Sequence, residues 1–319
     1  MTGTIVDVPG VLVGHAQNQE ALTGCSVLLL EQPSVCGVDV RGSAPGTRET
    51  DLLNPVNLVS VVHAICLSGG SAYGLDAATG VMEWLEEQGR GLDVGFGIVP
   101  IVPAAVLFDL SIGDPRIRPD RSMGYEACNR ASREVVQQGN VGAGTGATVG
   151  KLNGFGQAMK GGLGSASCSL PNGLVIGAMV AVNAVGHVFD PNTSEILAGP
   201  RDEQGDILDS VELMTTHSFS PIPPGTNTTI AIVASNANLT KAEANKVAQM
   251  AHDGLARTIR PIHTMHDGDT VFAVATGGIQ TSVDLIGALS AEVLAEAVLS
   301  AVKHAEQAGG IPAYRDRNR

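Results

Sequence analysis

A threonine that follows a proline- and glycine-rich segment is the residue best placed for nucleophilic chemistry. Thr228 comes three residues after Gly225 and opens an apolar, β-branched run that predicts a strand. A hydroxyl fixed there could attack the carbonyl of the preceding residue, Asn227. If that peptide bond broke, Thr228 would carry a free α-amine, which ordinarily has a pKa of about 7.7–8 and could act as base for its own hydroxyl. Taken alone, a threonine at a strand start is usually structural.

An acidic turn forty residues later is the second candidate. His266, Asp267 and Asp269 offer an imidazole and two carboxylates, which suit a hard or borderline cation. Their spacing matches no calcium or zinc signature, and Asp-Gly is ordinary turn chemistry. We therefore expect no metal. Because Asp269 immediately precedes an apolar run that predicts a strand, the carboxylates would lie at a strand end, where α/β folds place sites.

The glycine-rich stretch 142–147 matches Gly-x-Gly-x-x-Ala but lacks the context of a dinucleotide loop. A predicted helix precedes it where the fingerprint needs a strand, and residues 161–169 contain no acid for the ribose. The pair Gly150-Lys151 is no phosphate loop either, because Thr145 and Leu152 stand where that motif needs glycine and Ser or Thr. We expect no nucleotide cofactor.

Composition excludes several partner classes. The net charge is −13, from 19 Lys and Arg against 32 Asp and Glu, so nucleic acid and anionic membranes are poor partners. The apolar runs are shorter than the ~18–20 residues of a membrane helix, and the first 14 residues lack a secretory pattern, so we expect a cytoplasmic protein. Five widely spaced cysteines without a Cys-x-x-Cys pair predict buried thiols.

Strand and helix patterns alternate along the chain, which favours α/β layers in one domain. Strands are expected at Ile5–Val8, Val11–Gly14, Cys25–Leu30, Val35–Val40, Val59–Leu67, Leu174–Val182, Thr229–Ala234 and Thr270–Thr276. Helices are expected at Ser71–Gln88, Met123–Gln138, from the capping box at Thr240, and at about Ser282–Gln307. Pro200–Gly225 is expected to be a long surface loop.

Ordered motifs along nearly the whole chain resemble the DmpA family, also called peptidase family S58, of self-processing N-terminal nucleophile hydrolases. They are Gly46–Asp51, Ser68–Leu75, Val99–Val106, Gly142–Lys151, Lys160–Gly164, Val182–Gly186, Asn227–Ile230 and Asp267–Thr270. The resemblance implies a four-layer αββα sandwich, an α/β fold spanning 1–319. It also implies that the chain cuts itself between Asn227 and Thr228 into a large chain, 1–227, and a small chain, 228–319.

The resemblance also assigns roles to single residues. Thr228 matches the nucleophile, and Asp267 and Asp269 match the two positions that orient it and its amine; the nylon-oligomer hydrolases of the family carry this Asp pair. Asn183 matches an asparagine that stabilises the oxyanion, and Lys151 a lysine close to the nucleophile.

Two aromatic residues are expected in the substrate pocket, and one of them departs from the family pattern. Phe108 stands where some members carry a catalytic tyrosine, so that hydroxyl is missing, and Tyr73 belongs to the Ser68–Leu75 motif. The loss of an oxyanion donor can cost ~10²- to 10³-fold in rate. Either Asn183 and backbone groups stabilise the oxyanion without that hydroxyl, or the substrate differs from that of the members with the tyrosine.

The expected activity is of aminopeptidase type: hydrolysis of a small peptide or amide through an acyl-enzyme. We expect it to need no metal or other cofactor, and we expect the chain to form a homo-oligomer. Two alternatives stay open at this point. One is acyl transfer by a related terminal-threonine architecture. The other is an unprocessed relative that keeps the fold as a non-catalytic binding protein.

Overall fold

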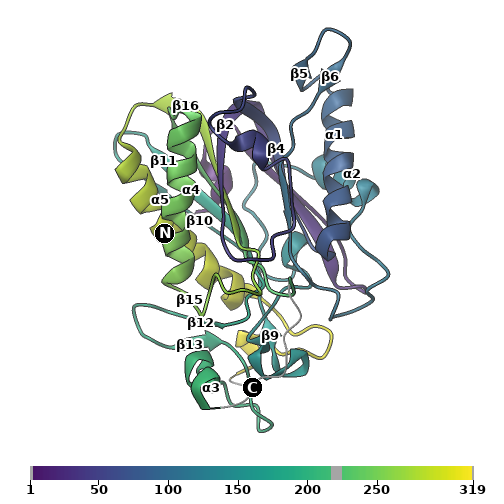
Figure 1. Cartoon of the computed structure of the whole chain (residues 1–319), viewed down its shortest axis with the longest axis vertical. Coiled ribbons are helices and arrows are strands. Elements are labelled where there is room, and N and C mark those ends of the chain that lie inside the picture. Colours follow the sequence, from purple (N-terminus) through teal and green to yellow (C-terminus); the bar gives the residue numbers. More distant parts are fainter. Residues whose placement is uncertain (1–2, 217–224, 318–319) are drawn as a thin grey trace.

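Two helical layers enclose two layers of strands in the computed structural model, which describes residues 3–216 and 225–317 (Figure 1). One outer layer holds α1 (Ala77–Glu87) and α2 (Arg121–Asn129). The other holds α4 (Lys241–Ala256) and α5 (Val283–His304). The arrangement confirms the expected αββα sandwich.

The strands of both inner layers form one continuous sheet of nine strands. Its order is β10 (Gly162–Ser169), β11 (Val175–Val182), β14 (Ile230–Ala237), β16 (Thr270–Ile279), β2 (Thr23–Val40), β4 (Val61–Ser68), β7 (Ala104–Val106) and β3 (Thr47–Arg48), with β1 (Val11–Asn18) paired to β2. The pairs β14–β16 and β4–β7 are parallel, and the others are antiparallel. The long strand β2 joins the layers, because its first half pairs with β1 and β4 and its second half with β16.

Alternation along β2 shows how the layers are separated by apolar cores. Val27 and Leu29 face the core under α1 and α2, whereas Leu28 and Leu30 face the core between the two strand layers. A third core lies under α4 and α5 and includes Val233 of β14. Each large side chain buried in these cores contributes on the order of 1.5–3 kcal/mol to folding.

The helix α5 is long and apolar enough, by length and composition alone, to cross a membrane. In the structure it packs on β10 and β11, and 67% of its most apolar window is buried. It is a core helix of the sandwich. All five cysteines are free thiols; four are buried and Cys168 is partly buried.

Several predicted strands need correction. Ile5–Val8 is a single 3-10 turn (Ile5–Asp7), since the Asp7 carboxylate accepts the Thr4 backbone N–H at 3.0 Å and closes the turn. The two runs at 25–30 and 35–40 form one strand, with a register irregularity between Leu29 and Ser34. The strand β10 was not predicted, because its glycines and serines carry little hydrophobic signal although most of the strand is buried.

The helix predicted at Met123–Gln138 is wrong beyond Asn129. The Asp120 side chain caps α2 by accepting the Met123 N–H at 2.9 Å, but the helix ends at Asn129. Ser132 then exchanges two backbone hydrogen bonds with Val13 of β1, each 3.0 Å long. Pairing with the sheet edge replaces the helical bonds, so no helix precedes the glycine-rich stretch.

Two further segments differ from expectation. The predicted helix at 71–88 begins as a 3-10 helix (Ser71–Asp76) before α1, and the expected loop 200–225 contains α3 (Ser210–Thr216). Residues 217–224 of that loop lie outside the described residues. The remaining short strands are β5 (Leu92–Asp93), β6 (Ile98–Val99), β8 (Thr148–Val149), β9 (Met159–Lys160), β12 (His187–Phe189), β13 (Ile196–Ala198) and β15 (Ile259–Arg260).

Candidate active site

Two parallel strands bring the candidate residues together at their amino ends. β14 and β16 start side by side, and just before them Asn227 and Asp267 form a parallel bridge. The expectation that the carboxylates lie at a strand end is confirmed. The site lies at the amino ends, whereas open parallel sheets place ligands at the carboxyl ends.

Thr228 is buried with its hydroxyl against the bond that precedes it. Its Oγ1 donates to the Asn227 carbonyl oxygen at 2.6 Å, and that oxygen also accepts the backbone N–H of Gly268 at 3.1 Å. The Thr228 N–H donates to the backbone carbonyl of Asn183 at 2.8 Å. The carbonyl of Asn227 is thus polarised by a backbone donor while the hydroxyl lies beside it. Gly268 was missed because a backbone N–H leaves no signal in residue type.

Asp269 accepts hydrogen bonds on both carboxylate oxygens. Its Oδ1 accepts the Thr229 N–H at 2.7 Å, and its Oδ2 accepts the His263 N–H at 3.2 Å and lies 2.8 Å from His263 Nδ1. His263 has a φ of +59°, an uncommon conformation for a non-glycine residue. Sequence reasoning missed His263, although its position three residues before His266 was a usable signal.

Asp267 has one satisfied and one unsatisfied oxygen. Its Oδ2 accepts the Thr264 N–H at 2.6 Å, whereas the buried Oδ1 has no hydrogen-bond partner in the described part of the chain. Burial and the neighbouring Asp269 charge raise the pKa of Asp267 to about 6. An unpartnered buried acceptor favours a donor such as an amine.

Lys151 and Asn183 are hydrogen-bonded to each other and connect to Thr228 through the Asn183 backbone carbonyl. The Lys151 Nζ donates to the Asn183 side-chain oxygen at 2.9 Å and to the carbonyls of Thr148 (2.9 Å), Asn183 (3.2 Å) and Ala184 (3.3 Å). Burial lowers the pKa of Lys151 to about 7, although Asp267 and Asp269 oppose the shift. The Asn183 backbone carbonyl that Lys151 contacts is the one that accepts the Thr228 N–H.

The two expected pocket residues differ in their placement. Phe108 is half-buried; its carbonyl accepts the Asn183 side-chain amide at 3.0 Å, and its ring centroid lies 6.3 Å from that of Phe155. Tyr73 is exposed, and the Arg118 guanidinium lies 3.8 Å over its ring centroid. Hydrogen bonds among the described residues link Phe108, but not Tyr73, to the group around Thr228.

A second buried lysine holds the glycine-rich stretch. Lys160 donates to the carbonyls of Thr145 and Ala147 at 2.9 and 2.8 Å, and burial lowers its pKa to about 7. Burial raises the pKa of Asp109 to about 6, and the positive charge of Lys160 opposes this shift. A side chain at Gly144 would come within 2.1 Å of the Leu163 backbone, so glycine allows the stretch to pack on β10. The stretch is scaffold that leads into Lys151.

The buried lysines predict a pH dependence of stability. Lys151 and Lys160 bind a proton up to pH 10.5 when unfolded but only to about 7 when folded, so their contribution to stability should rise with pH above 7. Each contributes at most about 1.4 kcal/mol per pH unit. Urea unfolding between pH 7 and 8.5 measures the slope, and comparison with the wild-type chain cancels the opposing contribution of the buried cysteines, which ionise more readily once unfolded. Relative to the wild type, Lys160→Met should lower the slope by up to about 1.4 kcal/mol per pH unit, whereas exposed Lys246→Met should leave it unchanged; equal slopes in all three would contradict the assignment.

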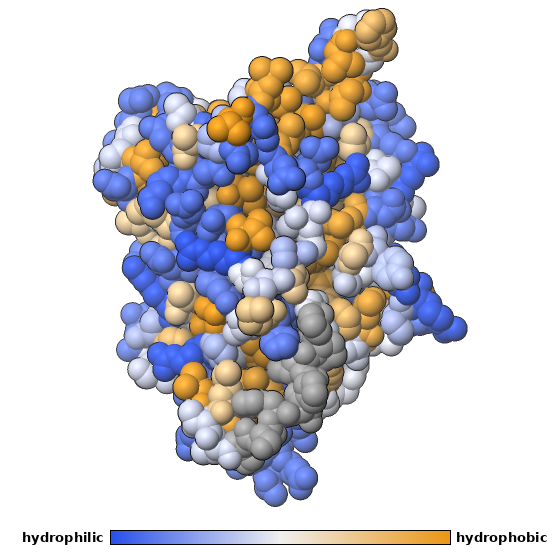
Figure 2. Space-filling view, viewed as in Figure 1, coloured by the Kyte–Doolittle hydropathy of each residue, from blue (hydrophilic) through white to orange (hydrophobic). Residues whose placement is uncertain are grey.

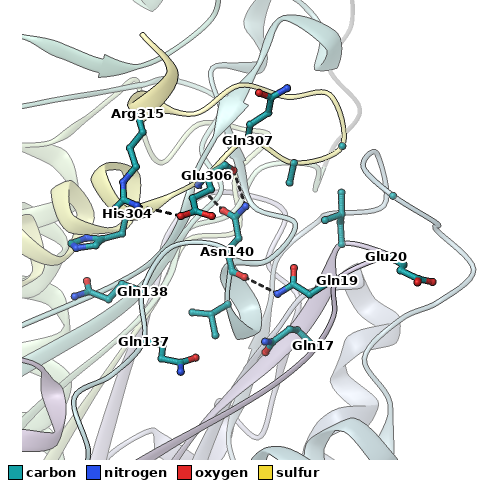
Figure 3. A pocket seen from close by; sticks show the side chains of 15 residues that line it. Gln17, Gln19, Glu20, Gln137, Gln138, Asn140, His304, Glu306, Gln307 and Arg315 are labelled. Atoms are coloured by element: carbon teal, nitrogen blue, oxygen red, sulfur yellow. Dashed lines mark hydrogen bonds and ion pairs between the residues drawn. The ribbon is translucent and has the colours of Figure 1, made fainter. Parts of the chain in front are cut away.

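A polar depression of about 910 Å³ lies elsewhere and takes no part in this group. Residues at the end of α5 and in the 137–141 segment line it, and their polar groups bond one another (Figure 3). Gln19 donates to the Asn140 carbonyl at 3.2 Å, and Asn140 donates to the Glu306 carbonyl at 2.7 Å. Among residues 3–216 and 225–317, no group of three or more His, Cys, Asp or Glu side chains is arranged to hold a metal ion.

Comparisons with known proteins find relatives along nearly the whole chain. The model of peptidase family S58 matches residues 3–314. The chain is 43% identical to an uncharacterized aminopeptidase of Mycobacterium tuberculosis, covering 98% of this chain and 97% of the relative. It is 33% identical to a 6-aminohexanoate-oligomer endohydrolase of Kocuria sp., covering 93% and 85%.

A solved structure shows the same fold. It is the L-aminopeptidase D-Ala-esterase/amidase of Ochrobactrum anthropi, described as a variant of the Ntn hydrolase fold. The TM-score is 0.73 at 20% identity, and the match covers 98% of this chain and 90% of that one. Because the family model matches residues 3–314 of its 319 residues, the chain belongs to peptidase family S58.

Proposed function

We propose that this chain is a self-processing amide hydrolase of aminopeptidase type, with Thr228 as its nucleophile. The observation that carries the proposal is the 2.6 Å contact of the Thr228 hydroxyl with the Asn227 carbonyl oxygen, which also accepts the Gly268 N–H. The names of the family and of the relatives support amide hydrolysis.

Activation begins with attack on the chain itself. The Thr228 Oγ1 adds to the Asn227 carbonyl carbon, and the Gly268 N–H stabilises the negative oxygen. The C–N bond then breaks, the hydroxyl proton is transferred to the Thr228 nitrogen, and an ester joins Asn227 to the Thr228 side chain. Water hydrolyses the ester, leaving an Asn227 carboxylate and a Thr228 with free hydroxyl and free amine.

Turnover repeats the chemistry on a substrate amide. The freed amine takes the Thr228 hydroxyl proton, the oxygen attacks the substrate carbonyl, and the amine product leaves with that proton. Water then releases the acid from the acyl-enzyme. The Asn183 backbone carbonyl, which holds the Thr228 nitrogen at 2.8 Å, would keep the amine in place. Asp269, fixed by His263, would hold the adjoining Thr229 N–H.

Asp267 favours substrates with a free amino end. Its buried Oδ1, which has no hydrogen-bond partner among residues 3–216 and 225–317, lies on the turn that carries Gly268 and can accept a hydrogen bond from either the Thr228 amine or the ammonium group of a substrate. A panel of matched amides with free and acetylated amino ends tests this. We expect hydrolysis of the free members at least ten times faster; equal rates would contradict the aminopeptidase assignment.

Gly268→Ala tests the backbone donor. A Cβ there would lie 2.5 Å from the Ala44 carbonyl oxygen and 2.7 Å from the Pro45 Cα, so the turn must shift and move the N–H away from the Asn227 carbonyl. Self-cleavage, followed by denaturing gel, should slow by roughly 10- to 100-fold. Gly156→Ala is the matched control, because its Cβ would meet no atom of the described part of the chain within 4 Å. Unchanged cleavage in a folded Gly268→Ala chain would remove this donor from the mechanism.

A further inference from the structure

A short hairpin projects from the body of the molecule and exposes apolar side chains. We call residues 91–99 the arm; it holds β5 and β6, and Figure 1 shows it beyond the end of α1, at the opposite end of the molecule from α3. Phe96 at its tip is 103% exposed, and Leu92, Val94 and Val99 are 38–46% exposed. Asp93 is its one charged residue.

A second group of exposed apolar side chains lies at the same end of the molecule as the arm. His63 of β4 donates its N–H to the Ile101 carbonyl at 2.9 Å, which places the base of the arm beside the start of β4. Leu58 and Val56, in the segment that enters β4, are 97% and 86% exposed. Figure 2 shows apolar surface over the projecting arm and the adjoining end of the molecule.

This surface is larger than a single chain usually leaves in water. The six side chains expose on the order of 700 Å² of apolar area, above the ~300–600 Å² of the largest patch on a typical monomer and close to the ~800 Å² per partner of a standard interface. A hairpin with two residues in each strand is also only marginally stable alone. Both facts call for a partner that covers the arm.

We propose that the arm and its flanking residues Val56 and Leu58 form the contact between two copies of this chain. With a net charge of −13, two copies repel over most of their surface, and this nearly uncharged patch is where they can approach. A twofold axis buries the same patch on both copies, which doubles the apolar area removed from water.

The contact leaves the candidate active site open. On β2, Val40 pairs with Thr270 at the catalytic end, whereas Val35 pairs with both Ala275 and Val61 of β4 at the arm's end. The arm and Thr228 therefore lie at opposite ends of the sheet. Substitutions in the arm should change assembly without changing self-cleavage.

Sedimentation velocity of the full chain over a hundredfold concentration range tests the proposal. The wild-type chain should sediment as a dimer or a multiple of one, and Phe96→Asp should raise the dissociation constant by at least about a hundredfold. Leu58→Asp serves as a second, independent variant. Val135→Asp, at a site 78% exposed but outside the patch, should leave assembly unchanged.

Self-cleavage and circular dichroism of each variant show whether it folds. A wild-type chain that stays monomeric throughout overturns the proposal and points to a different protein as the partner. Assembly that survives in both folded Phe96→Asp and Leu58→Asp chains also overturns it, because the contact then lies elsewhere. Weakened assembly in both, with Val135→Asp unaffected, supports it.

Discussion

Replacing Thr228 by alanine should leave a single chain of 32.6 kDa that hydrolyses no amide. The wild-type chain should separate on a denaturing gel into parts of about 23 and about 9 kDa, in proportion to their 227 and 92 residues. Alanine removes the hydroxyl that contacts the Asn227 carbonyl, so neither self-cleavage nor acyl-enzyme formation has a nucleophile. Loss of such a nucleophile costs roughly 10⁴-fold or more in rate.

Thr228→Ser is the matched control, because serine keeps the hydroxyl and loses only a methyl group. It should still cleave, more slowly, and its small chain should begin at position 228 by amino-terminal sequencing. A wild-type chain that stays whole yet hydrolyses amides would show that the terminal-threonine mechanism is wrong. Cleavage of Thr228→Ala at the same bond would show that another group attacks it.

Replacing Asp269 by asparagine should slow both self-cleavage and amide hydrolysis by roughly 10²- to 10³-fold. Three donors surround this carboxylate: the Thr229 N–H, the His263 N–H and His263 Nδ1. An asparagine has one acceptor oxygen, so its NH₂ group must face a donor, and the turn that carries Gly268 loses its register with β14. Gel time courses and kcat on a free-amine amide measure the two effects.

Asp114→Asn is the control for this change. Asp114 is on the surface and pairs with Arg116 at 2.9 Å, and such pairs contribute little to stability. Its rates should stay within about twofold of the wild type. If Asp269→Asn folds and cleaves at the wild-type rate, Asp269 does not position the nucleophile, and Asp267 is left as the carboxylate that matters.

Predictions from periodicity were accurate where an apolar stripe coincided with a local start or stop signal. The capping box at Thr240 begins α4, and the apolar runs around β11, β14 and β16 form strands within a few residues of their predicted bounds. Predictions failed where a distant segment supplied the hydrogen bonds. Ser132 pairs with β1 instead of continuing α2, and β10 is buried with a composition that carries little strand signal.

In the candidate site, too, residue types could be predicted from the sequence, whereas contacts with distant segments could not. Thr228, Asp267 and Asp269 were singled out by their side-chain chemistry, and the resemblance of the motifs to a known family added Asn183 and Lys151 to the predicted site. Roles for Gly268 and His263 were not predicted, because a backbone N–H and a bent backbone acquire their roles only from their surroundings.

By itself the amino-acid sequence determined that strands and helices alternate, and which hydroxyl, carboxylates and amide are available, since these depend on local periodicity and residue type. The order of the layers and the family came from the resemblance of its ordered motifs to a known family. Only the tertiary structure decided that the Thr228 hydroxyl lies 2.6 Å from its own preceding carbonyl oxygen, beside a donor forty residues away. It also decided that Lys151 and Asp267 have shifted pKa values. Distances between remote segments and removal from water are set by packing, which no local pattern encodes.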